Sequence, residues 1–231
     1  MTQPATSSRR LAVLDGRDHM LGPATAPVTL LEYGDYECPY TRRAQAVVVG
    51  LRRRFGDRLR VVYRHFPLAQ VHPHAEHAAE AAEAAAAQGR FWEMHDLLFH
   101  NQQALEDDHL QRYAVELGLD LARFNRELAE HTYAERVHED VVSGLRVSVR
   151  GTPTFFINGV RHDGPADLVT LGAAIERAAD TDGGAAMATE GEAAPAGREG
   201  DAPFVIRRDR EIYASDGGWF RSRWHFSFDE Y

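Results

Sequence analysis

The succession strand, helix, strand between residues 26 and 66 constrains the fold more than any other feature of this sequence. The segment APVTLLEYGD (residues 26–35) is rich in apolar and β-favouring side chains and predicts a buried strand. A second strand is predicted for RLRVVYRHF (residues 58–66). The helix predicted between them has an apolar stripe formed by Ala44, Val47, Val48, Leu51 and Phe55. Because a helix connects the two strands, we expect them to run parallel with a right-handed crossover.

The second half of the pattern differs from the first. Helical periodicity continues almost without interruption from residue 75 to residue 149. Strand character returns at TPTFFI, and the Asn158-Gly159 pair that follows is typical of a hairpin turn. A last helix is expected to include Leu168, Leu171 and Ile175. The predicted fold class is therefore α/β: a mixed central sheet flanked by helices, with an all-helical insertion between a βαβ half and a ββα half.

Composition separates the ends of the chain from this domain. We expect a disordered segment over residues 1–11 and a domain over residues 12–180, whose helical insertion covers residues 68–150. Residues 181–202 are mainly Gly, Ala, Glu and Thr, which is typical of a flexible linker. Residues 203–231 are aromatic and β-favouring again, but the segment is too short to build a core alone.

Charge and cysteine content limit the function and the compartment. A net charge of −9 over 231 residues argues against a nucleic-acid partner, because phosphate binding requires clustered Lys and Arg. The chain has neither the run of about 20 apolar residues that crosses a bilayer nor a secretory signal at its start, so no membrane partner is expected. A single cysteine excludes an intramolecular disulfide. These features together predict a cytoplasmic protein.

That single cysteine, Cys38, lies between the first predicted strand and the helix that follows. A helix N-terminus presents unpaired N–H groups and a partial positive charge, which favour a thiolate. Pro39 suits the first helical turn, where a missing N–H costs nothing. We therefore expect Cys38 to be a reactive nucleophile that is open to solvent. The alternative is a buried, inert cysteine, which is the usual fate of this residue type.

Three histidines, His72, His74 and His77, form a His-x-His-x-x-His pattern. Metal sites need three or four converging ligands that further residues support. These histidines fall at a junction between a loop and a helix, where a polar surface is the simpler interpretation. No metal site is predicted.

Four separate segments resemble the DsbA-like branch of the thioredoxin fold. They follow the family's order and cover roughly residues 12–180: LLEYGDYECPYT, VVYRHFPL, HPHAEHAAEAAEAAAAQGRFWEMHDLLF and GTPTFFINGV. The tail GGWFRSRWHFSFDEY is similar, over a short stretch, to the start of pirin-type cupin proteins, and none of that family's metal-binding histidines can be carried over to it.

The DsbA-like resemblance implies roles for particular residues. Cys38 corresponds to the family's nucleophilic cysteine, and Pro153 corresponds to a cis-proline whose loop faces that cysteine. The backbone of Thr152 would pair with an extended substrate segment. Pro39 and Tyr40, in the turn that carries the nucleophile, are the other substrate-binding residues that the resemblance implies.

Thr41 departs from the family pattern, because disulfide-oxidising relatives have a second cysteine at this position. The resemblance therefore implies a thiol-disulfide oxidoreductase with one thiol, in which a mixed disulfide on Cys38 is resolved by an external thiol. The Thr41 hydroxyl could donate a hydrogen bond to the Cys38 sulfur. No bound cofactor is expected, and the partners would be thiol- or disulfide-containing proteins, or glutathione as a co-substrate.

Two alternatives stay open. The site could have decayed into a module that binds extended peptides at the Thr152–Pro153 loop. The chain could also be a glutathione-using transferase or isomerase, like some relatives that have a non-cysteine group at the active position.

Overall fold

The computed structural model describes residue 12 and residues 14–181. The expected disordered segment (residues 1–11) and the pirin-like tail (residues 203–231) therefore lie outside the described residues, as does almost all of the expected linker (residues 181–202). Only the first residue of that linker is described, as the last residue of a helix.

The core of the fold is a five-stranded mixed sheet with the strand order β1-β3-β2-β4-β5. The strands β2 and β3 pair in parallel, and every other neighbouring pair is antiparallel. The strands are β1 (His19–Leu21), β2 (Val28–Gly34), β3 (Leu59–His65), β4 (Thr154–Ile157) and β5 (Val160–Arg161). The predicted parallel pairing of β2 with β3 and the predicted hairpin of β4 and β5 are confirmed, whereas β1 was not predicted.

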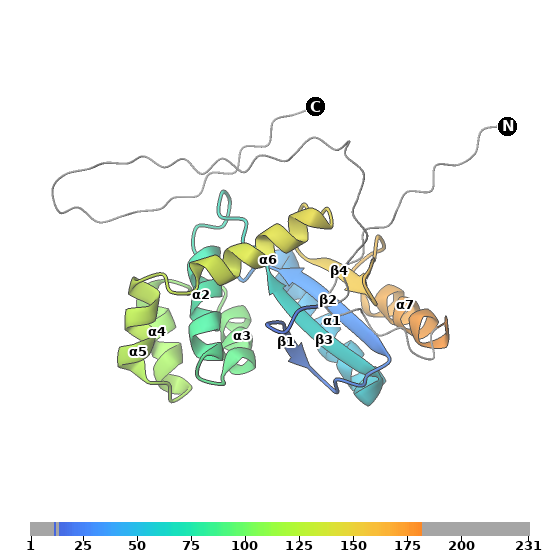
Figure 1. Cartoon of the computed structure of the whole chain (residues 1–231), viewed down its shortest axis with the longest axis horizontal. Coiled ribbons are helices and arrows are strands. Elements are labelled where there is room, and N and C mark those ends of the chain that lie inside the picture. The colour runs from blue at the N-terminus through green and yellow to red at the C-terminus, as the bar shows by residue number, and fades with distance from the viewer. Residues whose placement is uncertain (1–11, 13, 182–231) are drawn as a thin grey trace, which may run out of the picture. The chain divides into compact units, whose positions relative to one another are not determined.

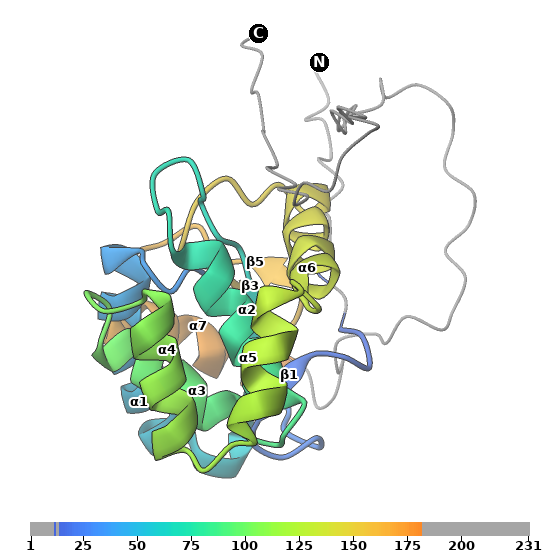
Figure 2. The ribbon, with the colours of Figure 1, turned by 90° about the vertical axis from the view of Figure 1, so that its left-hand side faces the viewer.

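The described part of the chain contains seven α-helices. They are α1 (Pro39–Phe55), α2 (Ala75–Ala86), α3 (Phe91–His100), α4 (Asp107–Glu116), α5 (Leu121–Ala129), α6 (Ala134–Arg146) and α7 (Leu168–Thr181). Helices α2 to α5 form a block beside the sheet, and α6 runs from this block back towards it (Figures 1 and 2). None of the described helices combines the length and the apolar character that crossing a membrane requires.

One hydrophobic cluster joins α1 and α7 to one face of the sheet. The apolar stripe predicted for α1 faces this cluster, and Leu51 is fully buried in it. From α7, Leu171 and Ile175 pack into the same cluster. Burying large apolar side chains stabilises the fold by roughly 1.5–3 kcal/mol each, so this layer fixes α1 on the sheet.

A second hydrophobic cluster fills the helical block. Most of its small members are alanines of α2, which let neighbouring helices approach closely, and its large members include Met94, Leu98 and Phe124. Tyr36 and Tyr63 also belong to this cluster, and they come from the sheet half of the fold. The block is therefore packed onto the segment that leads into α1.

Candidate functional site

The Cys38 backbone forms the N-cap of α1. It is extended, with φ −74° and ψ 120°, and Pro39 is the first helical residue. The first helical hydrogen bond runs from the N–H of Arg42 to the Cys38 carbonyl, at 3.1 Å. Proline at the first position requires no N–H partner, so this sequence begins the helix directly after the cysteine, as predicted.

Asp35 holds the turn that carries Cys38. Its Oδ1 atom accepts hydrogen bonds from the backbone N–H groups of Glu37, at 2.7 Å, and Cys38, at 3.1 Å. Its Oδ2 atom accepts from the N–H of Leu68 at 2.8 Å and lies 2.8 Å from Nδ1 of His72. Sequence reasoning missed this role, although an aspartate three residues before an N-cap is a recognisable signal for such a turn.

Gln102, in the link between α3 and α4, also supports the turn. Its side-chain amide donates to the carbonyls of Tyr36, at 2.8 Å, and Cys38, at 2.9 Å. Sequence reasoning missed Gln102 because a single glutamine between two helices has no characteristic pattern. The helical block therefore helps to position the cysteine.

The loop that precedes β4 lies next to Cys38. The Thr152–Pro153 peptide bond is cis. The Cys38 thiol donates to the carbonyl oxygen of Thr152, with Sγ and O 3.4 Å apart. Three residues that the resemblance grouped together, Cys38, Thr152 and Pro153, therefore lie at one place.

The expectation that Cys38 is open to solvent is wrong. The residue is 3% exposed. The Thr152 carbonyl oxygen lies next to its sulfur, and the Gln102 side-chain amide donates to its backbone carbonyl. The neighbouring Pro39 and Tyr40 are exposed, Tyr40 to 65%, and the Arg43 guanidinium lies 5.4 Å from the centre of the Tyr40 ring. The exposed part of this turn is therefore formed by Pro39 and Tyr40, and Cys38 adds little to it.

The expected hydrogen bond from Thr41 to the Cys38 sulfur is also absent. Thr41 is buried, and within the described residues its Oγ1 atom has no hydrogen-bond partner. Its methyl group lies close to Gly34 of β2, where an added Cβ would come within 2.9 Å of it. The side chain is thus packed against the sheet under the first turn of α1.

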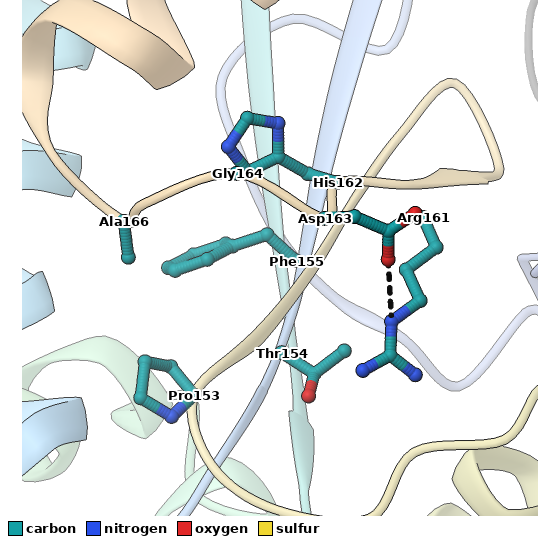
Figure 3. Close-up of a pocket in the computed structure, with 8 residues that line it drawn as sticks. All are labelled: Pro153, Thr154, Phe155, Arg161, His162, Asp163, Gly164 and Ala166. Carbon is teal, nitrogen blue, oxygen red and sulfur yellow. Dashed lines mark ion pairs between the residues drawn. The ribbon is translucent and has the colours of Figure 1, made fainter.

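A pocket of about 230 Å³ lies next to the loop that contains Pro153 (Figure 3). One side is apolar, with Phe155 and Ala166, and an ion pair between Arg161 and Asp163, 3.1 Å apart, lies at the other. The remaining lining residues are Pro153, Thr154, His162 and Gly164. The pocket thus lies directly beside the loop that brings Thr152 to Cys38.

A buried acid lies beneath α1. Both carboxyl oxygens of Glu32 accept from the Gln45 amide, at 3.1 and 3.2 Å. Burial raises the pKa of Glu32 to about 8, which the hydrogen bond from Gln45 opposes. The Gln45 carbonyl oxygen lies 3.3 Å from Nε2 of His95, whose pKa burial lowers to about 3, so a neutral polar network connects the sheet with α3.

The three histidines of the His-x-His-x-x-His pattern do not converge. Each lies within 3.0 Å of a different carboxylate. The partners of His72, His74 and His77 are Asp35, Glu37 and Asp107, respectively. The first two pairs tie the loop before α2 to the turn that contains Cys38.

The chain belongs to the thioredoxin family, since residues 15–177 match a family model described as Thioredoxin. This match confirms the predicted thioredoxin-like fold class. A thioredoxin-like oxidoreductase from Silicibacter pomeroyi is 29% identical, with a TM-score of 0.63 over 71% of this chain and 92% of that one.

Further solved structures share the DsbA-like form of this fold. BdbD from Bacillus subtilis is 22% identical, with a TM-score of 0.64 over 71% of this chain and 93% of its own. The alpha-DsbA1 protein of Wolbachia pipientis is 20% identical, with a TM-score of 0.61 over 72% of this chain and 92% of its own.

The curated relatives include proteins named Na(+)/H(+) antiporter NhaA. The Salinispora tropica protein is 49% identical over 159 residues, and the Salinispora arenicola protein is 52% identical over 162 residues. These matches cover 69% and 70% of this chain but only 24% and 25% of the relatives. The chain thus matches about a quarter of the length of these relatives.

Proposed function

We propose that this protein is a thiol-disulfide oxidoreductase that works through Cys38 alone. The observation that carries the proposal is the position of the Cys38 sulfur, at the N-terminus of α1 and 3.4 Å from the Thr152 carbonyl. The positive end of the helix stabilises a thiolate, and the Thr152 backbone supplies an edge for an extended substrate.

The reaction consists of two exchanges. After Cys38 loses its proton to solvent, the thiolate attacks one sulfur of an external disulfide. A new S–S bond forms to Cys38, the old S–S bond breaks, and the second sulfur leaves as a thiolate that takes a proton from water. An external thiolate then attacks the mixed disulfide and releases the Cys38 thiolate, so an external thiol and disulfide are exchanged without net change in the protein.

Glutathione is the external thiol that we propose. Thr41 has no sulfur to resolve the mixed disulfide, so the second thiol comes from another molecule. A reducing compartment supplies such a thiol, and the cytoplasmic location predicted from the sequence belongs to this proposal.

The burial of Cys38 defines the approach of the substrate. We infer that the attacked sulfur reaches Cys38 between the exposed Tyr40 ring and the Thr152 loop. A substrate main chain beside Thr152 would place a neighbouring side chain at the pocket near Pro153.

The proposed activity is tested with a cysteine peptide linked to glutathione by a disulfide. In the presence of reduced glutathione, the full chain should release the free peptide faster than glutathione alone. Cys38→Ser should lose this acceleration, whereas Arg53→Ala, at an exposed position in the last turn of α1, should retain it. Equal rates for Cys38→Ser and the unchanged protein would contradict the proposal.

A second candidate function is the docking of extended peptides without chemistry. It is favoured by the exposed Tyr40, the pocket next to Pro153 and the low exposure of Cys38. A fluorescent peptide without cysteine would then bind equally well to Cys38→Ser and to the unchanged protein, and less well to Tyr40→Ala. Binding of glutathione without thiol exchange would instead favour a transferase or isomerase.

A further inference from the structure

A group of metal-ligand side chains lies in the helical block, away from Cys38. His77 and Glu80 are three residues apart on α2, so they share one face of that helix. His131 comes from the turn between α5 and α6, and its Nδ1 atom is 3.0 Å from Oε1 of Glu80. One ligand atom from each of these three residues lies within 4.8 Å of the others.

The Glu80 carboxylate is an unusual group to bury. The residue is 2% exposed, and its Oε2 atom has no hydrogen-bond partner in the part of the chain that is described. A buried polar atom without a partner costs free energy, and such atoms are few in folded proteins. A cation bound between the two histidines would give this buried carboxylate a positive partner.

The backbone at His131 also points to a role for its side chain. The residue has φ 51°, just beyond the C-terminus of α5, where glycine or asparagine usually lies. A histidine there is held in a left-handed conformation that costs free energy relative to glycine. Its side chain is 59% exposed, so an ion could reach the group from solvent.

We propose that His77, Glu80 and His131 bind one Zn²⁺ ion. Two imidazole nitrogens and a carboxylate oxygen form a set that zinc accepts in proteins, with the fourth position left to water. Asp107 adds a second carboxylate at the edge of the group, with Oδ1 3.0 Å from Nε2 of His77. The ion would connect α2 to the α5–α6 turn and stabilise the helical block.

A second group of two histidines and a carboxylate is less suited to a metal. His19 and His65 both lie within 2.9 Å of Oε1 of Glu83, but the Arg136 guanidinium is 3.9 Å from the same oxygen. A positive group therefore already stands next to this carboxylate, and another cation there would be repelled. Among the residues that the structure describes, Glu80 forms an ion pair with His131 and with no arginine.

The test is a calorimetric titration of the full chain with Zn²⁺ in a Cys38→Ser background, which removes the thiol as a competing ligand. We expect one ion to bind per chain. His131→Asn keeps a residue that tolerates the left-handed conformation and should weaken binding at least roughly tenfold. Glu80→Gln should do the same, whereas His100→Ala, at an exposed histidine at the end of α3, should leave the affinity unchanged.

Thermal unfolding gives a second measurement, because an ion that binds only the folded state raises Tm. At the same Zn²⁺ concentration, the ion should raise the Tm of the Cys38→Ser protein more than that of its His131→Asn derivative. Absence of Zn²⁺ binding to the Cys38→Ser protein would overturn the proposal, because all three proposed ligands are still present in it. Equal affinities in the parent and in His131→Asn would overturn it as well.

Discussion

At the scale of single residues, the buried side chain of Thr41 decides what Cys38 can do. It lies three residues after Cys38 in the first turn of α1, so the two side chains are neighbours on the helix surface. Because Cys38 is the one cysteine of the sequence, no second thiol of the same chain can attack a mixed disulfide formed on it. The Thr41 hydroxyl is not bonded to the Cys38 sulfur.

We predict that Thr41→Cys converts the site to dithiol chemistry. The introduced thiol should attack a mixed disulfide on Cys38, form an intramolecular disulfide and release glutathione. After treatment with oxidised glutathione, the intact mass should show no glutathione attached and both thiols oxidised. Thr41→Val is the matched control and should retain one glutathione, and a stable adduct on Thr41→Cys would show that the two side chains do not meet.

Glu32 makes stability depend on pH. Burial raises its pKa from 4.5 to about 8, so the folded protein keeps the proton over a range in which the unfolded chain loses it. The unfolded state then binds fewer protons than the folded state, and the free energy of unfolding falls as pH rises from 4.5 towards about 8.

We predict that Glu32→Gln removes this contribution. The amide keeps the shape and stays neutral, so the variant should gain stability relative to the parent as pH increases. Urea unfolding at about pH 5 and about pH 8 measures the difference between the two proteins. A difference that stays constant over this range would mean that Glu32 is ionised in the folded state.

At the scale of secondary-structure elements, α6 approaches the sheet through Gly144. A Cβ atom at this glycine would lie 2.9 Å from the Phe66 ring and 3.1 Å from the Tyr33 ring, both of them buried. Because the rings are held by surrounding packing, they have little room to move.

We predict that Gly144→Ala lowers the free energy of unfolding by about 1–3 kcal/mol, even though alanine is the better helix former. Gly50→Ala in α1 is the control, since its Cβ would meet only the end of the half-exposed Leu168 side chain, at 3.1 Å. The control should be neutral or stabilising by up to about 1 kcal/mol. Denaturant unfolding distinguishes the two, and a stabilised Gly144→Ala would show that α6 can move away from the sheet.

The elements that the sequence predicts well are those with a local pattern. The apolar stripe of α1 and the Asn158-Gly159 turn both appear in the structure where the pattern indicates. Strand β1 has only three residues and no clear alternation, and pairing with β3 holds it in place. A strand that depends on its partner has no signal of its own.

At the scale of the whole molecule, the candidate site joins three parts of the chain. The turn with Cys38 comes from the βαβ half, the Thr152 loop from the ββα half and Gln102 from the helical block. The motifs of the first two parts predict their residues. The burial of Cys38 and the support from Gln102 arise only when the parts pack together, so no local pattern predicts them.

The central claim is that the folded site activates the Cys38 sulfur despite its low exposure. The most direct measurement is the rate at which oxidised glutathione modifies Cys38 in the folded protein and in the urea-unfolded chain, at one pH near neutral. We predict a higher rate in the folded protein, because the N-terminus of α1 stabilises the attacking thiolate. A lower rate in the folded protein than in the unfolded chain would contradict the claim and would leave Cys38 as a buried structural thiol.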